Sequence, residues 1–137
     1  MVDTVALDTN ALMMPVELEV RLFDELDRLL GGSSGAGGSV GFEPIVPQSV
    51  IEELRRLSDS GGEEGIAASV GHDLATDRCL TLDAEASYAD DAVVELARDG
   101  QTDYVVTNDG PLQDRVLETG VPVIALRGKN KLAITRP

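Results

Sequence analysis

Short apolar runs alternate along the chain with longer amphipathic stretches of helical period. The runs that we expect to form strands cover residues 2–7, 44–46, 79–82, 104–106, 121–126 and 131–135, the last at a sheet edge. The stretches that we expect to form helices cover residues 16–30, 47–57, 63–78, 89–98 and 111–119. Because strands and helices that alternate over short connections build right-handed βαβ units, the pattern predicts an α/β fold. We expect a three-layer α/β/α sandwich with a central, mainly parallel sheet.

The length of 137 residues is enough for one domain with a hydrophobic core, so we expect a single domain over residues 1–137. The Gly/Ser-rich stretch over 31–39 predicts a flexible loop within it. No apolar run is long enough to cross a bilayer, and the N-terminus lacks an export signal, which favours a cytoplasmic protein without membrane contact. Cys79 is the only cysteine, so the chain has no internal disulfide.

The charge balance is strongly acidic, with 25 acidic against 11 basic residues, and aromatic residues make up only 3% of the chain. An acidic, lysine-poor chain that still has a core is typical of a halophilic protein, because the Debye length in molar salt is only ~3 Å and self-repulsion is screened. Net charge is therefore poor evidence about partners here. The exception is a basic C-terminal tail over 127–137, which contains no acidic residue.

Two predicted strands deliver a carboxylate to the same edge of the sheet. Asp8 follows the first predicted strand, and Asp109 follows the fourth. In open parallel sheets, ligands collect beyond the carboxyl ends of the strands. Helical phase adds two more acids, because Glu53 and Asp90 each lie at the border of an apolar helix face, where an unpaired charge is costly.

Four carboxylates at one edge would repel each other and raise some of their pKa values. One or two hard divalent cations, Mg²⁺ or Mn²⁺, would relieve that repulsion, and such a site can hydrolyse a phosphodiester with water as the nucleophile. Each acid also has an ordinary interpretation. Asp8 and Asp109 can be helix caps or turn residues, and the acid pairs at 52–53 and 90–91 are typical of the first turn of a helix.

Four short motifs follow one another along the chain: LDTN at 7–10, PQSVIEEL at 47–54, YADDAVVELA at 88–97 and VVTND at 105–109. Together they closely resemble the PIN domain nucleases, and the resemblance runs from Val5 to about Ile134. It implies the α/β/α fold and a Mg²⁺- or Mn²⁺-dependent ribonuclease. It places the catalytic, metal-binding acids at Asp8, Glu53, Asp90 and Asp109.

The resemblance also implies supporting roles. Asp91, which helical phase places nearer to solvent than Asp90, would be an accessory metal ligand, and the choice of primary ligand within this pair stays open. Three polar residues match positions that orient the acids or the attacking water: Thr9, Asn10 and Thr107. Three cations of the tail fit RNA phosphate contacts, or form a solvated basic loop: Arg127, Lys129 and Lys131.

Two features favour one biological role for an endoribonuclease of this kind. The paired acids in YADD and the ending VPVIALRGKNKLAI resemble the archaeal and eukaryotic PIN proteins of small-subunit ribosomal RNA processing, which implies RNA and a ribosome-assembly factor as partners. The alternatives are a toxin ribonuclease paired with an antitoxin and a non-catalytic RNA- or protein-binding scaffold. PIN relatives often form homodimers. An aspartyl phosphotransferase is disfavoured, because Asn10 occupies the position where that chemistry needs a second aspartate.

Overall fold

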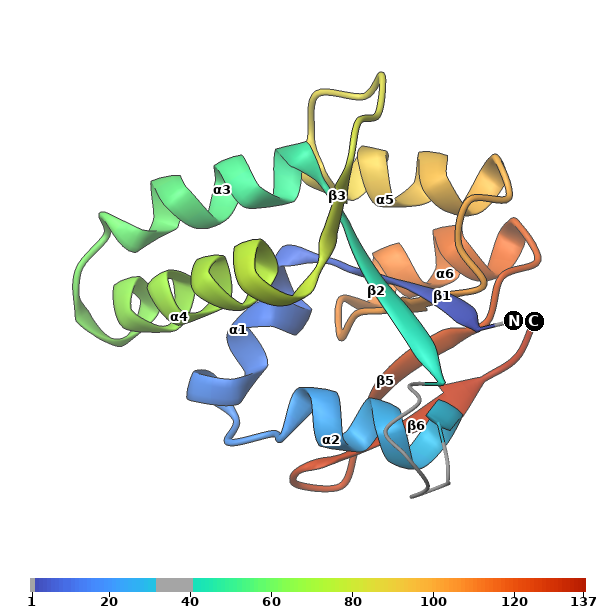
Figure 1. Ribbon diagram of the computed structural model, residues 1–137, viewed down its shortest axis with the longest axis horizontal. Helices are drawn as coiled ribbons and strands as arrows, with labels where there is room; N and C mark the ends of the chain where they lie inside the picture. The colour runs from blue at the N-terminus through green and yellow to red at the C-terminus, as the bar shows by residue number, and fades with distance from the viewer. Residues whose placement is uncertain (1, 32–40) are drawn as a thin grey trace.

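The computed structural model describes residues 2–31 and 41–137 (Figure 1). The strands are β1 (Asp3–Leu7), β2 (Phe42–Pro47), β3 (Leu80–Leu82), β4 (Tyr104–Val106), β5 (Val123–Arg127) and β6 (Lys131–Thr135). The helices are α1 (Thr9–Glu17), α2 (Leu22–Leu26), α3 (Gln48–Ser58), α4 (Gly62–Arg78), α5 (Ala89–Arg98) and α6 (Gly110–Glu118), and α2 continues into a π-helical turn, η1 (Asp27–Gly31). The predicted loop over 31–39 lies outside the described residues except for Gly31.

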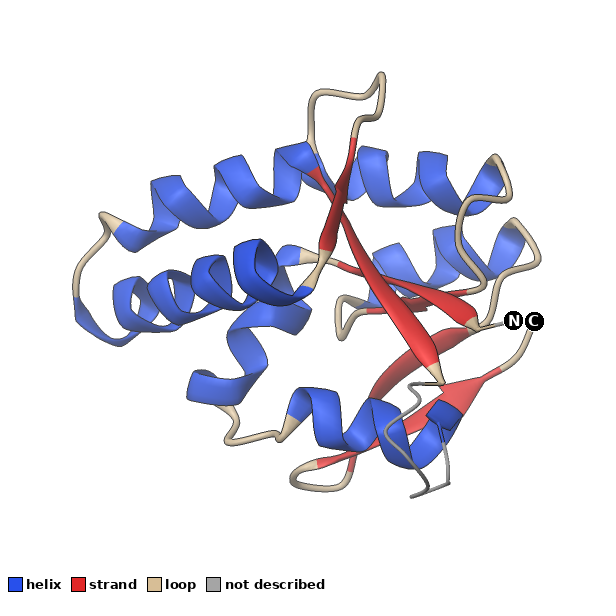
Figure 2. Cartoon of the chain, in the orientation of Figure 1, coloured by secondary structure: helices blue, strands red, loops and turns tan. Residues whose placement is uncertain are grey.

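The strands form one six-stranded sheet in the order β3-β2-β1-β4-β5-β6. All neighbouring pairs are parallel except β5 and β6, which run antiparallel. Helices cover both faces, and in Figure 2, with the labels of Figure 1, helices α5 and α6 lie to the right of strand β2 while α1 and α4 lie to its left. The predicted α/β sandwich with a mainly parallel sheet is therefore confirmed, and so is the edge strand over 131–135.

The central position of β1 explains its apolar sequence. Val5, Ala6 and Leu7 have no exposed surface, as expected for a parallel strand that is covered on both faces. Leu7 pairs in register with Val106 of β4, so the chain leaves both strands at the same edge of the sheet. The residues that follow these two strands are consequently brought close together.

One predicted element is wrong. The expected helix over 16–30 is interrupted, because α1 begins at Thr9 and ends at Glu17, and α2 begins only at Leu22. Glu19 in the connection has a φ of 56°, which a continuous right-handed helix cannot contain. The other predicted elements agree with the structure to within one or two residues at each end.

Helix α4 lies unusually close to α1. A Cβ at Gly71 would lie 2.8 Å from the carbonyl oxygen of Leu12, so this approach requires glycine. The buried face of α4 is otherwise made of small residues: Gly65, Ala67, Ala68 and Ala75. This packing holds α4 beside α1 at the carboxyl edge of the sheet. No helix of the described residues is long and apolar enough to cross a membrane.

Candidate metal centre

A cavity of about 340 Å³ opens at the carboxyl edge of β1 and β4. Four acids singled out by the sequence line it: Asp8, Glu53, Asp90 and Asp109. Two come from the residues that follow β1 and β4, and two from the first half of α3 and the first turn of α5. The fold therefore brings together side chains that are separated by most of the chain length.

Asp8 is the innermost of these acids, and only 2% of its surface is exposed. The pKa of Asp8 is raised to about 7, mainly by burial and to a lesser extent by the nearby Asp90 and Asp109, while hydrogen bonds from Thr107 and the Ala11 amide oppose the rise. Its Oδ1 accepts a 2.7 Å hydrogen bond from the amide of Ala11 and so caps α1. The capping interpretation of Asp8 is therefore correct, and the same residue also lines the cavity.

Asp109 has the same arrangement at the neighbouring strand. Its Oδ1 accepts a 3.1 Å hydrogen bond from the amide of Leu112, which caps α6, and its own amide donates to the Thr107 hydroxyl at 3.0 Å. Thr107 is completely buried and also hydrogen-bonds Asp8. One buried hydroxyl thus contacts the Asp8 side chain and the Asp109 backbone amide, which links the ends of the two strands.

Glu53 faces the cavity from α3 and is oriented by a neighbour. The Thr9 hydroxyl donates a 2.5 Å hydrogen bond to Oε1 of Glu53, which links the start of α1 to α3. Glu52, one position earlier, is exposed and does not line the cavity, as helical phase predicts.

Asn10 contributes through its side-chain amide, which binds a backbone group of another segment. Its Oδ1 accepts a 3.0 Å hydrogen bond from the amide of Asn108, and the Asn108 Oδ1 accepts one of 2.8 Å from the amide of Leu126. These contacts join α1, the β4–α6 connection and β5. The strand ends that carry the acids therefore form one cross-linked unit.

The paired acids of α5 have different surroundings. Asp90 lines the cavity, whereas Asp91 does not and instead forms a 2.9 Å ion pair with Arg115 of α6. Helical phase predicts that Asp91 is the more exposed of the two, and this is wrong: Asp90 is exposed because the cavity is open to solvent, while Asp91 is partly covered. Partial desolvation raises the pKa of Asp90. The negative charges of Asp109 and Glu53 also raise it, and the positive charge of Arg115 opposes the rise.

The carboxylate oxygens of the four acids are suitable ligands for a hard divalent cation, although the four side chains do not converge on a single point. Within residues 2–31 and 41–137, no three acidic, histidine or cysteine side chains are arranged closely enough to hold a metal ion. The three ion pairs of this part of the chain do not include any of the four acids. Carboxylates that lack a cationic partner, one of them buried with a raised pKa, favour binding of a cation from solution.

Two further acids at the cavity were not predicted. Glu17 ends α1 and Glu64 lies in the first turn of α4, and both line the cavity. Glu17 was missed because the sequence pattern placed it at the start of a helix over 16–30, whereas it is the last residue of α1. Glu64 gave no sequence signal, because acids are common in the first turn of a helix.

The three predicted RNA-binding cations lie outside the cavity lining. Arg127 ends β5, Lys129 lies in the turn before β6, and Lys131 begins β6. All three are exposed, and the Lys131 ammonium lies 3.8 Å from a carboxylate oxygen of Glu25. Any contact that they make to RNA would therefore be away from the four acids.

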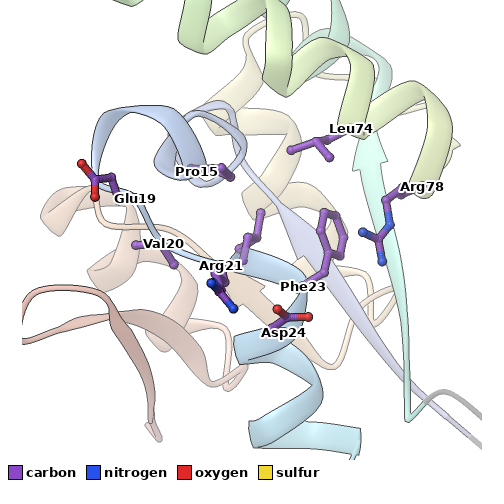
Figure 3. A pocket seen from close by; sticks show the side chains of 9 residues that line it. Pro15, Glu19, Val20, Arg21, Phe23, Asp24, Leu74 and Arg78 are labelled. Carbon is purple, nitrogen blue, oxygen red and sulfur yellow. The ribbon is translucent and has the colours of Figure 1, made fainter.

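A larger hollow of about 610 Å³ lies elsewhere, between the α1–α2 connection and α4 (Figure 3). Its wall includes Phe23 and Arg78, whose guanidinium carbon lies 4.0 Å from the centre of the ring. This arrangement packs a cation on an aromatic face and places no cluster of acids or nucleophiles there. Size alone is therefore a poor guide to a candidate site, because the acids gather at the smaller cavity.

Comparison with known proteins gives one family. A family model described as a PIN like domain matches residues 5–129. Ribonuclease VapC4 of Methanocaldococcus jannaschii is 30% identical over 131 residues, which cover 93% of this chain and 92% of that protein.

Two solved structures are similar in fold. The PIN domain endonuclease Utp24 is 25% identical with a TM-score of 0.75, over 98% of this chain and 92% of that one. A domain of a functionally unknown protein from Methanocaldococcus jannaschii has a TM-score of 0.63 at 14% identity, over 94% of each chain, and this likeness shows the fold alone.

Proposed function

The chain belongs to the family of PIN-like domains, and on that premise we propose that it is an endoribonuclease that hydrolyses RNA phosphodiester bonds with divalent cations. The observation that carries the proposal is the cavity that Asp8, Glu53, Asp90 and Asp109 share. Relatives named as a ribonuclease and as an endonuclease support it.

The four acids would hold one or two Mg²⁺ or Mn²⁺ ions. When bound, such a cation supplies positive charge that activates water and stabilises the charge developing on the phosphate. The donors are carboxylate oxygens, which both ions accept, so the site does not select between them by ligand type.

The protein's own contribution is to hold the acids in place before the cation arrives. Asp8 and Asp109 are fixed by capping bonds and by the shared Thr107 hydroxyl, and Glu53 is fixed by Thr9. Such supporting hydrogen bonds set ligand orientation, and their loss typically costs 10–100-fold in metal affinity or activity.

We propose RNA processing as the biological role. Support comes from the paired Asp90 and Asp91 and from the extended ending after β5, both of which resemble processing enzymes of ribosomal RNA. A toxin ribonuclease is the second candidate, because the relative named VapC4 matches nearly the whole chain at 30% identity.

The proposed activity is tested with purified protein in high KCl, on structured ribosomal precursor RNA and on unstructured RNA, with Mn²⁺, Mg²⁺ or EDTA. We expect cleavage that needs the cation and is lost in Asp8→Asn and Glu53→Gln. Glu52→Gln is the matched control, because it makes the same change one residue away, outside the cavity. A folded protein that binds no Mn²⁺ and cuts no RNA would instead support a non-catalytic scaffold.

The biological role needs a separate test in cells. A toxin is expected to arrest growth on induction, and Asp8→Asn should abolish the arrest. A processing enzyme is expected to leave uncut ribosomal precursor when the gene is deleted, with no arrest on induction. Co-purified RNA and protein partners, and the mass of the native particle, would show whether an antitoxin, a ribosome-assembly factor or a second copy is bound.

A further inference from the structure

A second cavity of about 330 Å³ adjoins the acidic one. Glu53 and Asp90 line both, so the two cavities share a wall. The second cavity differs in character, because Arg56 of α3 and Arg115 of α6 lie on its other sides. We call it the arginine cleft, lined by Glu53, Arg56, Tyr88, Asp90, Asp91 and Arg115.

The two arginines are positioned to offer charge to a ligand. Arg56 is exposed and takes part in none of the three ion pairs of the described residues. Arg115 pairs with Asp91, but both side chains are 47% exposed, so the pair is solvated and can be exchanged for another anion. The chain has only 11 basic residues, yet two of them line this cleft beside its three acids, whereas the lining of the adjoining acidic cavity contains no lysine or arginine.

Tyr88 adds an aromatic surface at the same place. It immediately precedes α5 and is 77% exposed, although the chain contains only two tyrosines, two phenylalanines and no tryptophan. Both phenylalanines are buried. An exposed ring beside two arginines is the combination that binds single-stranded nucleic acid, since the cations hold the backbone and the ring stacks on a base.

We propose that the arginine cleft binds the single-stranded segment of RNA next to the bond that is cleaved. Arg56 and Arg115 bind phosphates of that segment, and Tyr88 stacks on one base. The proposal rests on the proposed nuclease function, because it is the shared wall of Glu53 and Asp90 that places this segment beside the acids. It also explains how an acidic protein brings a polyanion to a cluster of carboxylates: the nearest cations lie on the same continuous surface.

Binding and cleavage are measured separately, so that the two proposals can fail independently. Affinity for a fluorescent oligouridylate is measured in an Asp8→Asn background with Mg²⁺, where no RNA is cut, over a series of KCl concentrations. A strand of the same length without bases reports on stacking. The variants are Tyr88→Ala, Tyr88→Phe, Arg56→Gln and Arg115→Gln, with melting curves to verify the fold.

The controls are matched in charge and position. Arg55→Gln removes a neighbouring exposed arginine of the same helix, and Arg98→Gln removes an exposed arginine of α5, and neither residue lines the cleft. Arg127→Gln with Lys129→Gln tests the competing route through the basic tail.

The expected results are specific to each variant. Tyr88→Ala weakens oligouridylate binding about 5- to 100-fold, leaves the base-free strand unaffected, and is rescued by Tyr88→Phe. Arg56→Gln and Arg115→Gln weaken both ligands and each lower the slope of log affinity against log salt by about 0.7. The two control arginines leave both affinities unchanged.

The proposal is overturned if the cleft variants bind no more weakly than Arg55→Gln, or if only the tail variant weakens binding. Wild-type cleavage of RNA together with that result would leave the nuclease standing and remove the cleft. If binding depends on the cleft but the wild type cleaves no RNA, the binding site would stand and the nuclease function would be removed.

Discussion

Two buried carboxylates of this protein have opposite surroundings. Asp8 is 2% exposed and Glu25, on α2, is 6% exposed. The Arg28 guanidinium holds the pKa of Glu25 below its usual value, helped by the Leu132 amide and by Lys131. The pKa of Asp8 is instead raised to about 7, mainly by burial and in smaller part by the acids around it.

The difference separates an acid whose charge is neutralised by the protein from an acid whose charge favours binding of a cation from solution. Glu25 accepts 2.8 Å hydrogen bonds from both Arg28 and the Leu132 amide, and Arg28 also donates to the Leu132 carbonyl, so the cluster joins α2 to β6. The protein itself satisfies this charge. Asp8 receives hydrogen bonds but no cation from within the described residues, which favours an external one.

The largest expected difference between the two acids is in catalysis. Asp8→Asn should lower RNA cleavage more than about 100-fold, because removing a metal ligand costs more than removing the groups that orient one. Glu25→Gln should leave the rate of the folded protein close to that of the wild type, because Glu25 does not line the cavity. Initial rates at saturating Mn²⁺ check this. An equal loss in both variants would contradict the distinction.

The next difference is in the pH dependence of unfolding without metal. The pKa of Asp8 rises from 3.8 to about 7 on folding, so the folded state holds more protons in this window and stability falls as pH rises through it. Above that window Asp8→Asn should be more stable than the wild type by about 1–3 kcal/mol, less the small cost of a weaker cap. Chemical denaturation with EDTA across this pH range measures the change. Mn²⁺ should stabilise only the wild type.

Glu25 should show the opposite sign. Because its pKa is lowered on folding, its contribution is present above the usual value of 4.5 and is lost as pH falls through the folded value. Glu25→Gln should lower the free energy of unfolding by about 1–2 kcal/mol near neutral pH. The loss is modest because Arg28 is half-exposed, so water can solvate its charge when the carboxylate is removed. Denaturation of this variant at neutral and at acidic pH tests the assignment. A penalty that persists at strongly acidic pH would count against it.

The smallest effect is expected at Asp91, a partly covered acid with a cationic partner. Asp91→Asn should change stability by less than about 1 kcal/mol, because surface ion pairs contribute little. Its cleavage activity should stay far above that of Asp90→Asn, which removes an acid of the cavity. Cleavage rates of the two variants, measured side by side, decide which of the paired acids is essential.

Sequence patterns predicted these regions unequally. The strands and four of the six acids of the cavity were predictable, because apolar runs that stop at a carboxylate and the phase of α3 and α5 are local signals. Glu25 was not, because its partner amide lies 107 positions away and the helix around it looks ordinary. The Arg115–Asp91 ion pair was not predictable for the same reason, because its partners lie 24 positions apart on different helices.

The start of α1 was missed for a different reason. Asp8 is both an acid of the cavity and the cap of the helix, and α1 contains Pro15, a residue that normally disfavours a helix interior. The sequence also could not show that the connection at Glu19 leaves the right-handed helical region. A sequence pattern alone cannot show that Asp8 both caps α1 and lines the cavity.

The order of the sheet has a consequence for synthesis of the protein. Strand β1 is translated first, but its neighbour β4 arrives only when most of the chain has been made, since the linked residues Asn10 and Asn108 are 98 positions apart. Until then the cavity lacks Asp109 and the buried Thr107 hydroxyl. On the proposed function, an incomplete nascent chain would therefore have no assembled site with which to cut the message being translated, and a product truncated before β4 should leave the cell's RNA intact.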